Sequence, residues 1–194
     1  RDREEIRVIP GHGDAPRAPW PRYGLAQGLG EKLGRGEVLL GALPSRPQRG
    51  TDDRGWAVND CRHLVLVLGD QLNADSAAFD GFDPAQDAVL IVEAREESTH
   101  VWSHKARTAL FLSAMRHFAD ELTASGCRVI YRRLDDHGDA TLADGWQAAV
   151  ASMRPQLLIC VEPGDWRVWQ RLNAFSAASR VPLDLRSDRH FLCS

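Results

Sequence analysis

The chain of 194 residues lacks several features that would point to a particular class of protein. Its formal net charge is −3, so no overall basic field marks a nucleic-acid binder, and any such contact would be local. No segment approaches the ~18 consecutive apolar residues of a membrane span, and the opening Arg-Asp-Arg-Glu-Glu does not resemble a signal peptide. These absences predict a cytoplasmic protein that does not contact a membrane.

Closely spaced metal ligands are also missing. The four cysteines form no CxxC motif and lie far apart, at Cys61, Cys127, Cys160 and Cys193. This spacing favours reduced, buried thiols over a disulfide frame, a zinc site or an iron–sulfur cluster. His100 and His104 could share a helix face as metal ligands, but no acid stands at a matching motif spacing. We therefore predict no metal site.

Known catalytic motifs are absent as well. The chain has no phosphate-binding GxxxxGK[ST] loop, and neither Ser103 nor Ser113 stands in a nucleophile elbow. The stretch Gly28–Gly34 imitates a dinucleotide loop, but it misses the GxGxxG spacing and follows no predicted strand. No catalytic residue is predicted in this chain.

Residues 1–60 differ in composition from the rest of the chain. They hold ten of the sixteen glycines and six of the ten prolines, and their apolar residues follow neither a 2.0 nor a 3.6 period. Such a segment buries too little apolar surface to offset the entropy of ordering. We expect 1–60 to be a disordered leader, or one assigned upstream of the true start, and 61–194 to be the folded domain.

From residue 63 onward, short apolar runs alternate with helical patterns. Strands are predicted at Leu64–Leu68, Ala88–Val92, Arg128–Tyr131, Leu157–Val161 and Leu183–Leu185. Helices are predicted at Lys105–Ser125, with an apolar stripe of Phe111, Met115, Phe118 and Leu122, at Ala140–Met153, and at Asp165–Ser179. Repeated β-α-β units indicate an α/β fold, a doubly wound, flavodoxin-like (Rossmann-like) parallel sheet of five strands.

Polar side chains, most of them acidic, follow three of the predicted strands at the point where each strand ends. These residues are Asp70 and Gln71, which follow Gly69 after the first strand, Glu93 and Glu97 after the second, and Glu162 after the fourth. In a doubly wound sheet such loops converge on one crevice. Carboxylates accept hydrogen bonds from hydroxyl and ring N–H groups but repel phosphates, which predicts a polar ligand without phosphate. The alternative is that these acids cap helices and solvate loops.

An aromatic pair follows the fourth strand. Trp166 and Trp169 are three residues apart and therefore face the same side of a helix, alongside Arg167 and Arg171. If this side is exposed, it could dock a partner domain, and if it is buried, it belongs to the core. The sequence alone favours neither.

Five sequence blocks together resemble one family. They are LVLGDQLN, VLIVEAREES, the long block from His104 to Asp136, ICVEPGDWRV and DLRSDRHFL. Together they are similar to the amino-terminal domain of the bacterial photolyase-related proteins, that is, iron–sulfur cryptochromes and (6-4) photolyases. The resemblance runs from about His63 to Ser194.

The resemblance implies a light-harvesting antenna domain that binds 6,7-dimethyl-8-ribityllumazine. In the family this domain passes excitation to FAD in a following helical domain, which also carries a 4Fe-4S cluster, for repair of (6-4) lesions in DNA or for blue-light sensing. The implied lumazine-binding residues are Gly69, Asp70, Gln71, Glu93, Glu97, His100, Phe111 and Glu162. Damaged DNA and the FAD-binding helical domain are the implied partners. The chain stops at Ser194, before the FAD domain, so we do not expect it to repair DNA by itself.

Two residues depart from the family pattern. His100 stands where a tyrosine is common, and Phe111 stands where a smaller aliphatic residue is common. A phenylalanine at the wall of a ring-sized slot would narrow it and weaken lumazine binding. The alternatives are a stand-alone α/β nucleotide-binding or signalling module without photochemistry, and a degenerate remnant that binds nothing.

Overall fold

The computed structural model describes residues 61–99 and 103–189, so the predictions for 1–60, for His100 and for Cys193 lie outside the described residues. The strands are β1 (His63–Val67), β2 (Ala88–Val92), β3 (Val129–Arg132), β4 (Leu157–Val161) and β5 (Leu183–Arg186). The helices are η1 (Ala77–Phe79), α1 (Arg95–Thr99), α2 (Lys105–Ala124), α3 (Leu134–His137), α4 (Leu142–Met153) and α5 (Trp166–Ser179). Each of the five predicted strands is present, with ends shifted by no more than one residue.

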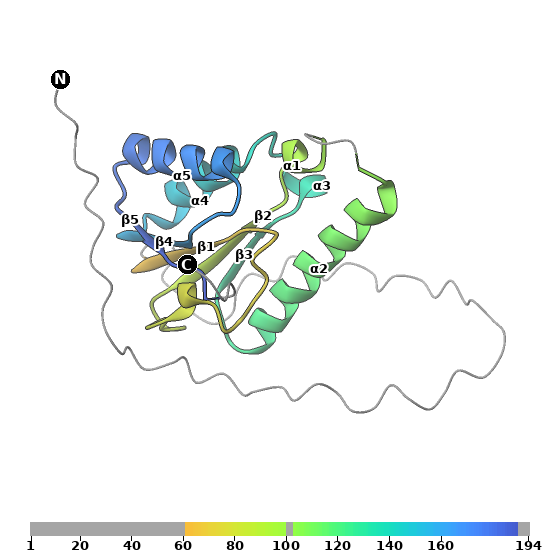
Figure 1. The fold of residues 1–194 in the computed structure, drawn as a ribbon. Helices are drawn as coiled ribbons and strands as arrows, with labels where there is room; N and C mark the ends of the chain where they lie inside the picture. Colours follow the sequence, from red (N-terminus) through yellow and green to blue (C-terminus); the bar gives the residue numbers. More distant parts are fainter. Residues whose placement is uncertain (1–60, 100–102, 190–194) are drawn as a thin grey trace, which may run out of the picture. The chain divides into compact units, whose positions relative to one another are not determined.

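The five strands form one parallel sheet in the order β3-β2-β1-β4-β5 (Figure 1). The chain winds outward from β1 through β2 to β3, then crosses to the other side of β1 for β4 and β5. The predicted α/β, doubly wound sheet is confirmed, and its order is the Rossmann one of the two common doubly wound orders. The direction of winding reverses between β1 and β4, which is where proteins of this architecture place their ligands.

Apolar side chains cover the sheet because alternate residues of each strand point to opposite faces. On one face, Leu66 lies in register with Leu90 and Cys160, and all three are buried. Trp146 of α4 and Leu172 of α5 complete this cluster, and Figure 1 shows both helices on the same side of the sheet. The central strands β1, β2 and β4 are buried on both faces and almost continuously apolar, whereas the edge strands β3 and β5 are half-buried and carry Arg132, Asp184 and Arg186.

Helix α2 corrects one detail of the predicted apolar stripe. Met115, Phe118 and Leu122 are buried, but Phe111 is 44% exposed. The reason is its position: Phe111 lies against Gly69, where β1 has already ended, so the sheet covers only one side of its ring. Only the carboxyl-terminal half of α2 is therefore fully packed into the core.

Helix boundaries follow the capping residues. Thr141 and Asp144 form a reciprocal capping box, so α4 begins at Leu142 rather than at the predicted Ala140. Asp165 caps α5 through the backbone N–H of Arg167, as predicted. Gly126, with a φ of +88°, provides the left-handed residue expected after α2.

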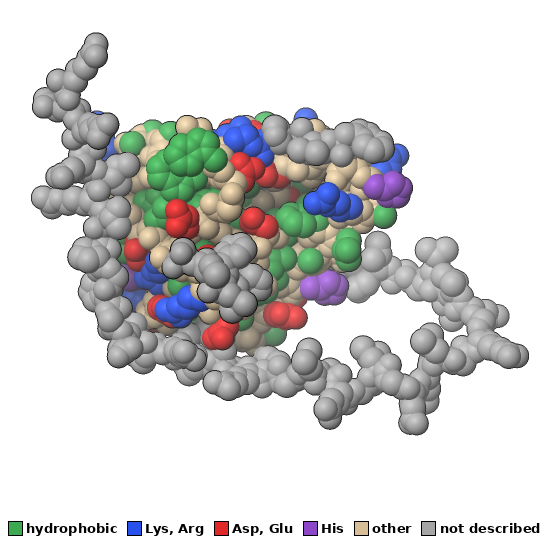
Figure 2. All heavy atoms as spheres, in the orientation of Figure 1, with side chains coloured by type: hydrophobic (Ala, Val, Ile, Leu, Met, Phe, Trp, Pro, Cys, Tyr) green, Lys and Arg blue, Asp and Glu red, His purple; other side chains and the backbone are tan. Residues whose placement is uncertain are grey.

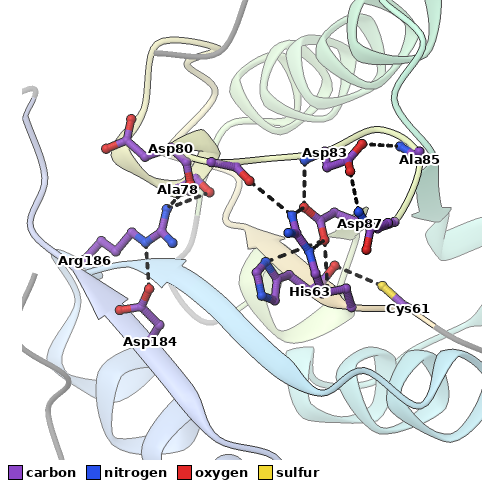
Figure 3. Close-up of polar contacts among 12 residues, drawn as sticks. Cys61, His63, Ala78, Asp80, Asp83, Ala85, Asp87, Asp184 and Arg186 are labelled. Atoms are coloured by element: carbon purple, nitrogen blue, oxygen red, sulfur yellow. Dashed lines mark hydrogen bonds and ion pairs between the residues drawn. The ribbon is translucent and has the colours of Figure 1, made fainter. Parts of the chain in front are cut away.

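A buried aspartate holds together the amino-terminal ends of β1 and β2 (Figure 3). The carboxylate of Asp87, only 1% exposed, accepts from Nε and NH2 of Arg62 at 2.9 and 2.6 Å. It also accepts from the backbone N–H groups of His63 and Asp83, at 3.1 and 2.8 Å. This cluster fixes the point at which the long connection between β1 and β2 enters β2. It lies at the amino-terminal ends of these strands, whereas the candidate site lies at carboxyl-terminal strand ends.

None of the helices in residues 61–99 and 103–189 is long and apolar enough to cross a membrane.

Candidate functional site

A cavity of about 150 Å³ lies at the carboxyl ends of β1 and β4, where the winding of the sheet reverses. Its lining residues are Asp70, Gln71, Leu72, Asn73, Ser76, Val161, Gly164 and Asp188. Two residues predicted from the sequence, Asp70 and Gln71, line the cavity. Gly69 and Glu162 do not line it, but each is next in the sequence to a lining residue, Asp70 and Val161. The structure thus brings the loops after β1, β4 and β5 together around one small, polar space.

The lining of this cavity is acidic and neutral, with no lysine or arginine among the eight residues. Asp70 and Asp188 supply carboxylates, and Asn73 and Ser76 supply an amide and a hydroxyl. Such groups accept from and donate to hydroxyls, whereas an approaching phosphate would meet two negative charges. The chemistry of the lining favours a hydroxyl-rich ligand over a phosphorylated one.

Gln71 joins the two main walls of the cavity. Its amide nitrogen donates to the backbone carbonyls of Val161 and Glu162, at 3.3 and 3.1 Å. These carbonyls stand at the end of β4, so Gln71 closes the β1 loop onto the neighbouring strand. Because the nitrogen is engaged in this way, the amide oxygen is the atom of Gln71 suited to meet a ligand donor.

Gly69 allows close packing at the end of β1. A Cβ at this position would lie 2.6 Å from Cε1 of Phe111 and 3.1 Å from Sδ of Met115. The phenyl ring of Phe111 therefore rests on the backbone of Gly69, beside Asp70. Two residues implied by the family resemblance, Gly69 and Phe111, are in contact, and the ring occupies space that a smaller side chain would leave open.

Glu93 follows β2, but its carboxylate faces the protein interior. Oε1 accepts from Nε of Arg116 at 2.7 Å and from the hydroxyl of Tyr131 at 2.6 Å. Oε2 accepts from NH2 of Arg116 at 2.9 Å and from the backbone N–H of Leu134 at 3.0 Å. Glu93 is 1% exposed and does not line the cavity. With four protein donors already bound, it supports α2, β3 and α3 rather than offering a lone pair to a ligand.

Burial and hydrogen bonding act in opposite directions on the pKa of Glu93. Burial raises the pKa of the carboxyl group, but the bonds from Arg116, Tyr131 and the Leu134 amide outweigh it, and the net pKa is lowered. Tyr131 shows the counterpart, because burial and the neighbouring Glu93 carboxylate raise the pKa of its hydroxyl. The cluster is therefore stable with Glu93 charged and Tyr131 protonated.

Glu97 lies on the short helix α1 and is exposed. It does not line the cavity. The pKa of Arg167, at the start of α5, is raised mainly by its hydrogen bond to Asp165, and the charge of Glu97 adds to this. Among the described residues, the structure groups Gly69, Asp70, Gln71, Phe111 and Glu162 at the β1 and β4 ends, with Glu93 and Glu97 outside that group.

Sequence reasoning missed three polar side chains of the lining, those of Asn73, Ser76 and Asp188. Asn73 stands inside the quoted block LVLGDQLN, and Asp188 follows the fifth strand, whose end was not inspected. Extending the strand-end rule to that last strand would have found Asp188. Ser76 had no such signal, because it reaches the cavity as the N-cap of the short η1 turn.

The described residues contain no group of three or more His, Cys, Asp or Glu arranged to hold a metal ion. Cys61, Cys127 and Cys160 are free and buried. Burial raises the pKa of the Cys61 and Cys127 thiols to about 11 and that of Cys160 to about 12. Thiols held this firmly in the protonated form are poor nucleophiles and poor metal ligands.

The two tryptophans of α5 form a stacked pair on the protein surface. Their ring centroids are 4.5 Å apart with an interplanar angle of 10°. Trp166 is 62% exposed, and Figure 2 shows a hydrophobic patch over α5. This exposure argues against a core role for Trp166, while docking of a partner at this patch stays a prediction.

Comparison with known proteins identifies the family of this chain. Residues 65–194 match the family described as deoxyribodipyrimidine photo-lyase-related protein. A (6-4) photolyase of Agrobacterium fabrum (strain C58 / ATCC 33970) is 43% identical over 132 residues, which cover 68% of this chain. The matched region spans only 26% of that relative's length. The family match takes in every strand end that forms the cavity, and the chain belongs to the deoxyribodipyrimidine photo-lyase-related protein family.

Proposed function

We propose that the domain is the light-harvesting antenna part of a photolyase- or cryptochrome-type flavoprotein and that it binds 6,7-dimethyl-8-ribityllumazine. The ligand would supply absorption of violet-blue light, and the protein would supply the binding site and its orientation. The proposal joins two supports: membership of the photolyase-related family and a polar cavity at the switch point of the sheet.

The observation that carries the proposal is the chemistry of the cavity lining. A ribityl chain is uncharged and rich in hydroxyl groups, and the lining offers two carboxylates, two amides and one hydroxyl, from Asp70, Asp188, Gln71, Asn73 and Ser76. Each hydroxyl that leaves water needs a protein partner, since an unpaired buried polar group costs about 1–3 kcal/mol. The lining residues therefore fit the polyol part of the lumazine.

The volume limits how much of the ligand this cavity holds. Sites for compounds of this size commonly measure about 300–1,000 Å³, whereas the cavity measures about 150 Å³. It would accommodate the ribityl chain, and the fused ring would need further surface. Gly69 and Glu162 are next to lining residues in the sequence, and Phe111 contacts Gly69, so these three are the described residues we propose for that surface, with Glu97 and His100 as further candidates.

The proposed partners follow from the same assignment. Excitation would pass to FAD in a helical domain, whose chemistry serves (6-4) lesion repair or blue-light sensing, and damaged DNA would be contacted only through the full-length protein. The FAD and the 4Fe-4S cluster belong to that second domain in this proposal. The chain spans about a quarter of the length of the Agrobacterium photolyase it matches, so these activities concern the whole protein.

Titration of the full 194-residue chain with 6,7-dimethyl-8-ribityllumazine, followed by the ligand's fluorescence, tests the proposal. We expect saturable binding with a Kd on the order of micromolar, equivalent to about −8 kcal/mol. Adenosine triphosphate serves as the comparison ligand, because a stand-alone nucleotide-binding module would bind it. Binding of the nucleotide without binding of the lumazine would replace the antenna proposal with that alternative.

A further inference from the structure

An arginine at the end of β5 reaches across to the η1 turn. NH1 of Arg186 donates to the backbone carbonyls of Ala77 and Asp80, at 2.7 and 2.9 Å, and lies 3.4 Å from that of Ala78. Nε of the same side chain donates to Asp184 at 2.8 Å. Figure 3 shows the guanidinium placed between the strand and the turn. One side chain thus joins segments more than one hundred residues apart in the sequence.

The contact supplies a charged donor to carbonyls of the turn, of which that of Ala77 also accepts from the backbone N–H of Asp80. The last carbonyls of a short helix have no partners within it, and a cation at this end is favourable. Asp184 fixes the orientation of the guanidinium through Nε, and the side chain of Arg186 is only 21% exposed. Hydrogen bonds from an ionised donor are stronger than neutral ones, so this contact is a firm connection between β5 and η1.

A second arginine reinforces the same connection. Arg189 forms an ion pair with Asp80, the residue that ends the η1 turn. Its side chain is 54% exposed, so this pair is the weaker of the two contacts. The segment after β5 therefore holds the turn at two points, from Arg186 and from Arg189.

The cavity lies next to these two contacts. Ser76, the N-cap of η1, lines it on one side, and Asp188, which stands between the two arginines in sequence, lines it on another. Ala77, whose carbonyl receives the shortest bond from Arg186, is the next residue after Ser76. Moving the turn relative to β5 would therefore move Ser76 relative to Asp188.

We propose that Arg186 is a positioning residue of this site: by holding η1 against the end of β5, it sets the separation of Ser76 and Asp188 and keeps the cavity formed. Arg189 supports the same geometry from the rim. Arg186 does not line the cavity, so its effect on a ligand acts through the two walls. Only the ligand measurement below rests on the proposed function.

Hydrogen exchange in the ligand-free full chain tests directly whether Arg186 holds the η1 turn against β5. The amides of Phe79, Asp80 and Phe82 donate to backbone carbonyls of the turn, so their exchange reports how often the turn opens. We expect Arg186→Gln to speed exchange of these amides about tenfold without changing the amides of β1, since local opening is independent of global unfolding. Arg186→Lys keeps the charge and one donor and should recover most of the protection.

The matched control is Arg180→Gln, which removes the arginine that ends α5 and precedes the amino-terminal end of β5. It should leave exchange in the η1 turn unchanged. If Arg186→Gln does not fold, Arg186→Lys and Arg189→Gln carry the test, each with a smaller increase in exchange confined to the turn. Unchanged exchange in folded Arg186 variants would overturn the proposal.

Ligand binding separates a positioning role from simple stabilisation. In conditions where all variants are fully folded, Arg186→Gln should weaken 6,7-dimethyl-8-ribityllumazine binding about tenfold, equivalent to ~1.4 kcal/mol, with partial recovery in Arg186→Lys. Equal affinity in the wild-type chain and Arg186→Gln would overturn the positioning role and leave the proposed function intact. If the wild-type chain binds no lumazine, the proposed function fails. The hydrogen-exchange result still decides whether Arg186 holds the η1 turn in place.

Discussion

Two carboxylates follow neighbouring strands of the same sheet, and their surroundings are opposite. Asp70, after β1, is exposed at the wall of a cavity, whereas Glu93, after β2, is 1% exposed and accepts four hydrogen bonds from the protein. The strand-end rule predicts both positions equally well. The difference lies in the neighbours: Arg116 and Tyr131 point at Glu93. A carboxylate at a strand end is thus available to a ligand only where protein groups do not already donate hydrogen bonds to it.

The largest expected effect is on the stability of the fold, and it comes from removing the partners of buried Glu93. Arg116→Met leaves a buried carboxylate without its cation, which should lower the free energy of unfolding by about 3–5 kcal/mol. Glu93→Gln should cost less, about 1–3 kcal/mol, because the remaining guanidinium is 35% exposed and can turn to water. Urea denaturation measures both. The reverse order of the two variants would contradict the account of a buried charge held by Arg116.

The stability of the protein at acid pH should also depend on Glu93, because its pKa is lowered in the folded state. The folded-state pKa of Glu93 lies below its ordinary value of 4.5, so its contribution to stability is present above that pH and is lost as the pH falls through the folded pKa. Stability measured from pH 7 down to pH 3 should therefore decline more steeply in the wild-type chain than in Glu93→Gln. Asp83, Asp144 and Asp165 also have lowered pKa values and contribute to the decline in both proteins, which makes the difference between slopes the informative quantity.

The next effect concerns Asp70 and is expected in binding rather than in stability. Asp70→Ala should weaken lumazine binding about ten- to a hundredfold, since each ~1.4 kcal/mol is a factor of ten. Stability should change little because the side chain is exposed. Lys105→Ala is the control and should leave affinity nearly unchanged. Glu97→Ala, outside the cavity lining, should fall between them, and a larger loss there than in Asp70→Ala would mean that the site is misplaced.

The smallest effect tests the packing beside Asp70. Phe111→Ile removes a ring that rests on Gly69, the residue before Asp70, and should open space there, improving lumazine affinity a few-fold, or about 0.5–1 kcal/mol. Leu110→Ala is the matched control, because Leu110 is 72% exposed on the same helix. Fluorescence titration of the two variants side by side gives the result. Weaker binding in Phe111→Ile would show that the ring supports the ligand instead of narrowing its site.

Much of the fold could be predicted because its signals are local. The central strands β1, β2 and β4 are buried on both faces and therefore form almost uninterrupted apolar runs in the sequence. Asp165 and Gly126 mark helix ends through chemistry that acts within a few residues. The start of α4 was placed two residues too early, although its capping box, Thr141 with Asp144, is also a local pattern in the sequence.

The site was less predictable because its signals are not local. Whether Glu93 meets a ligand depends on Arg116 and Tyr131, which come from α2 and β3. Ser76 enters the cavity only because η1 folds back toward β5, and Arg186 holds it there from more than one hundred residues away. Hydrophobic period and strand-end position carry no information about such long-range pairings.

We propose that the cavity at the ends of β1 and β4 takes an uncharged, hydroxyl-rich chain. The most direct test compares 6,7-dimethyl-8-ribityllumazine with the same compound esterified by phosphate at the end of its ribityl chain, both titrated into the full chain. Because Asp70 and Asp188 would face the added negative charge, we predict binding of the phosphate ester at least about tenfold weaker, a difference of ~1.4 kcal/mol or more. Equal or tighter binding of the phosphate ester would contradict the claim.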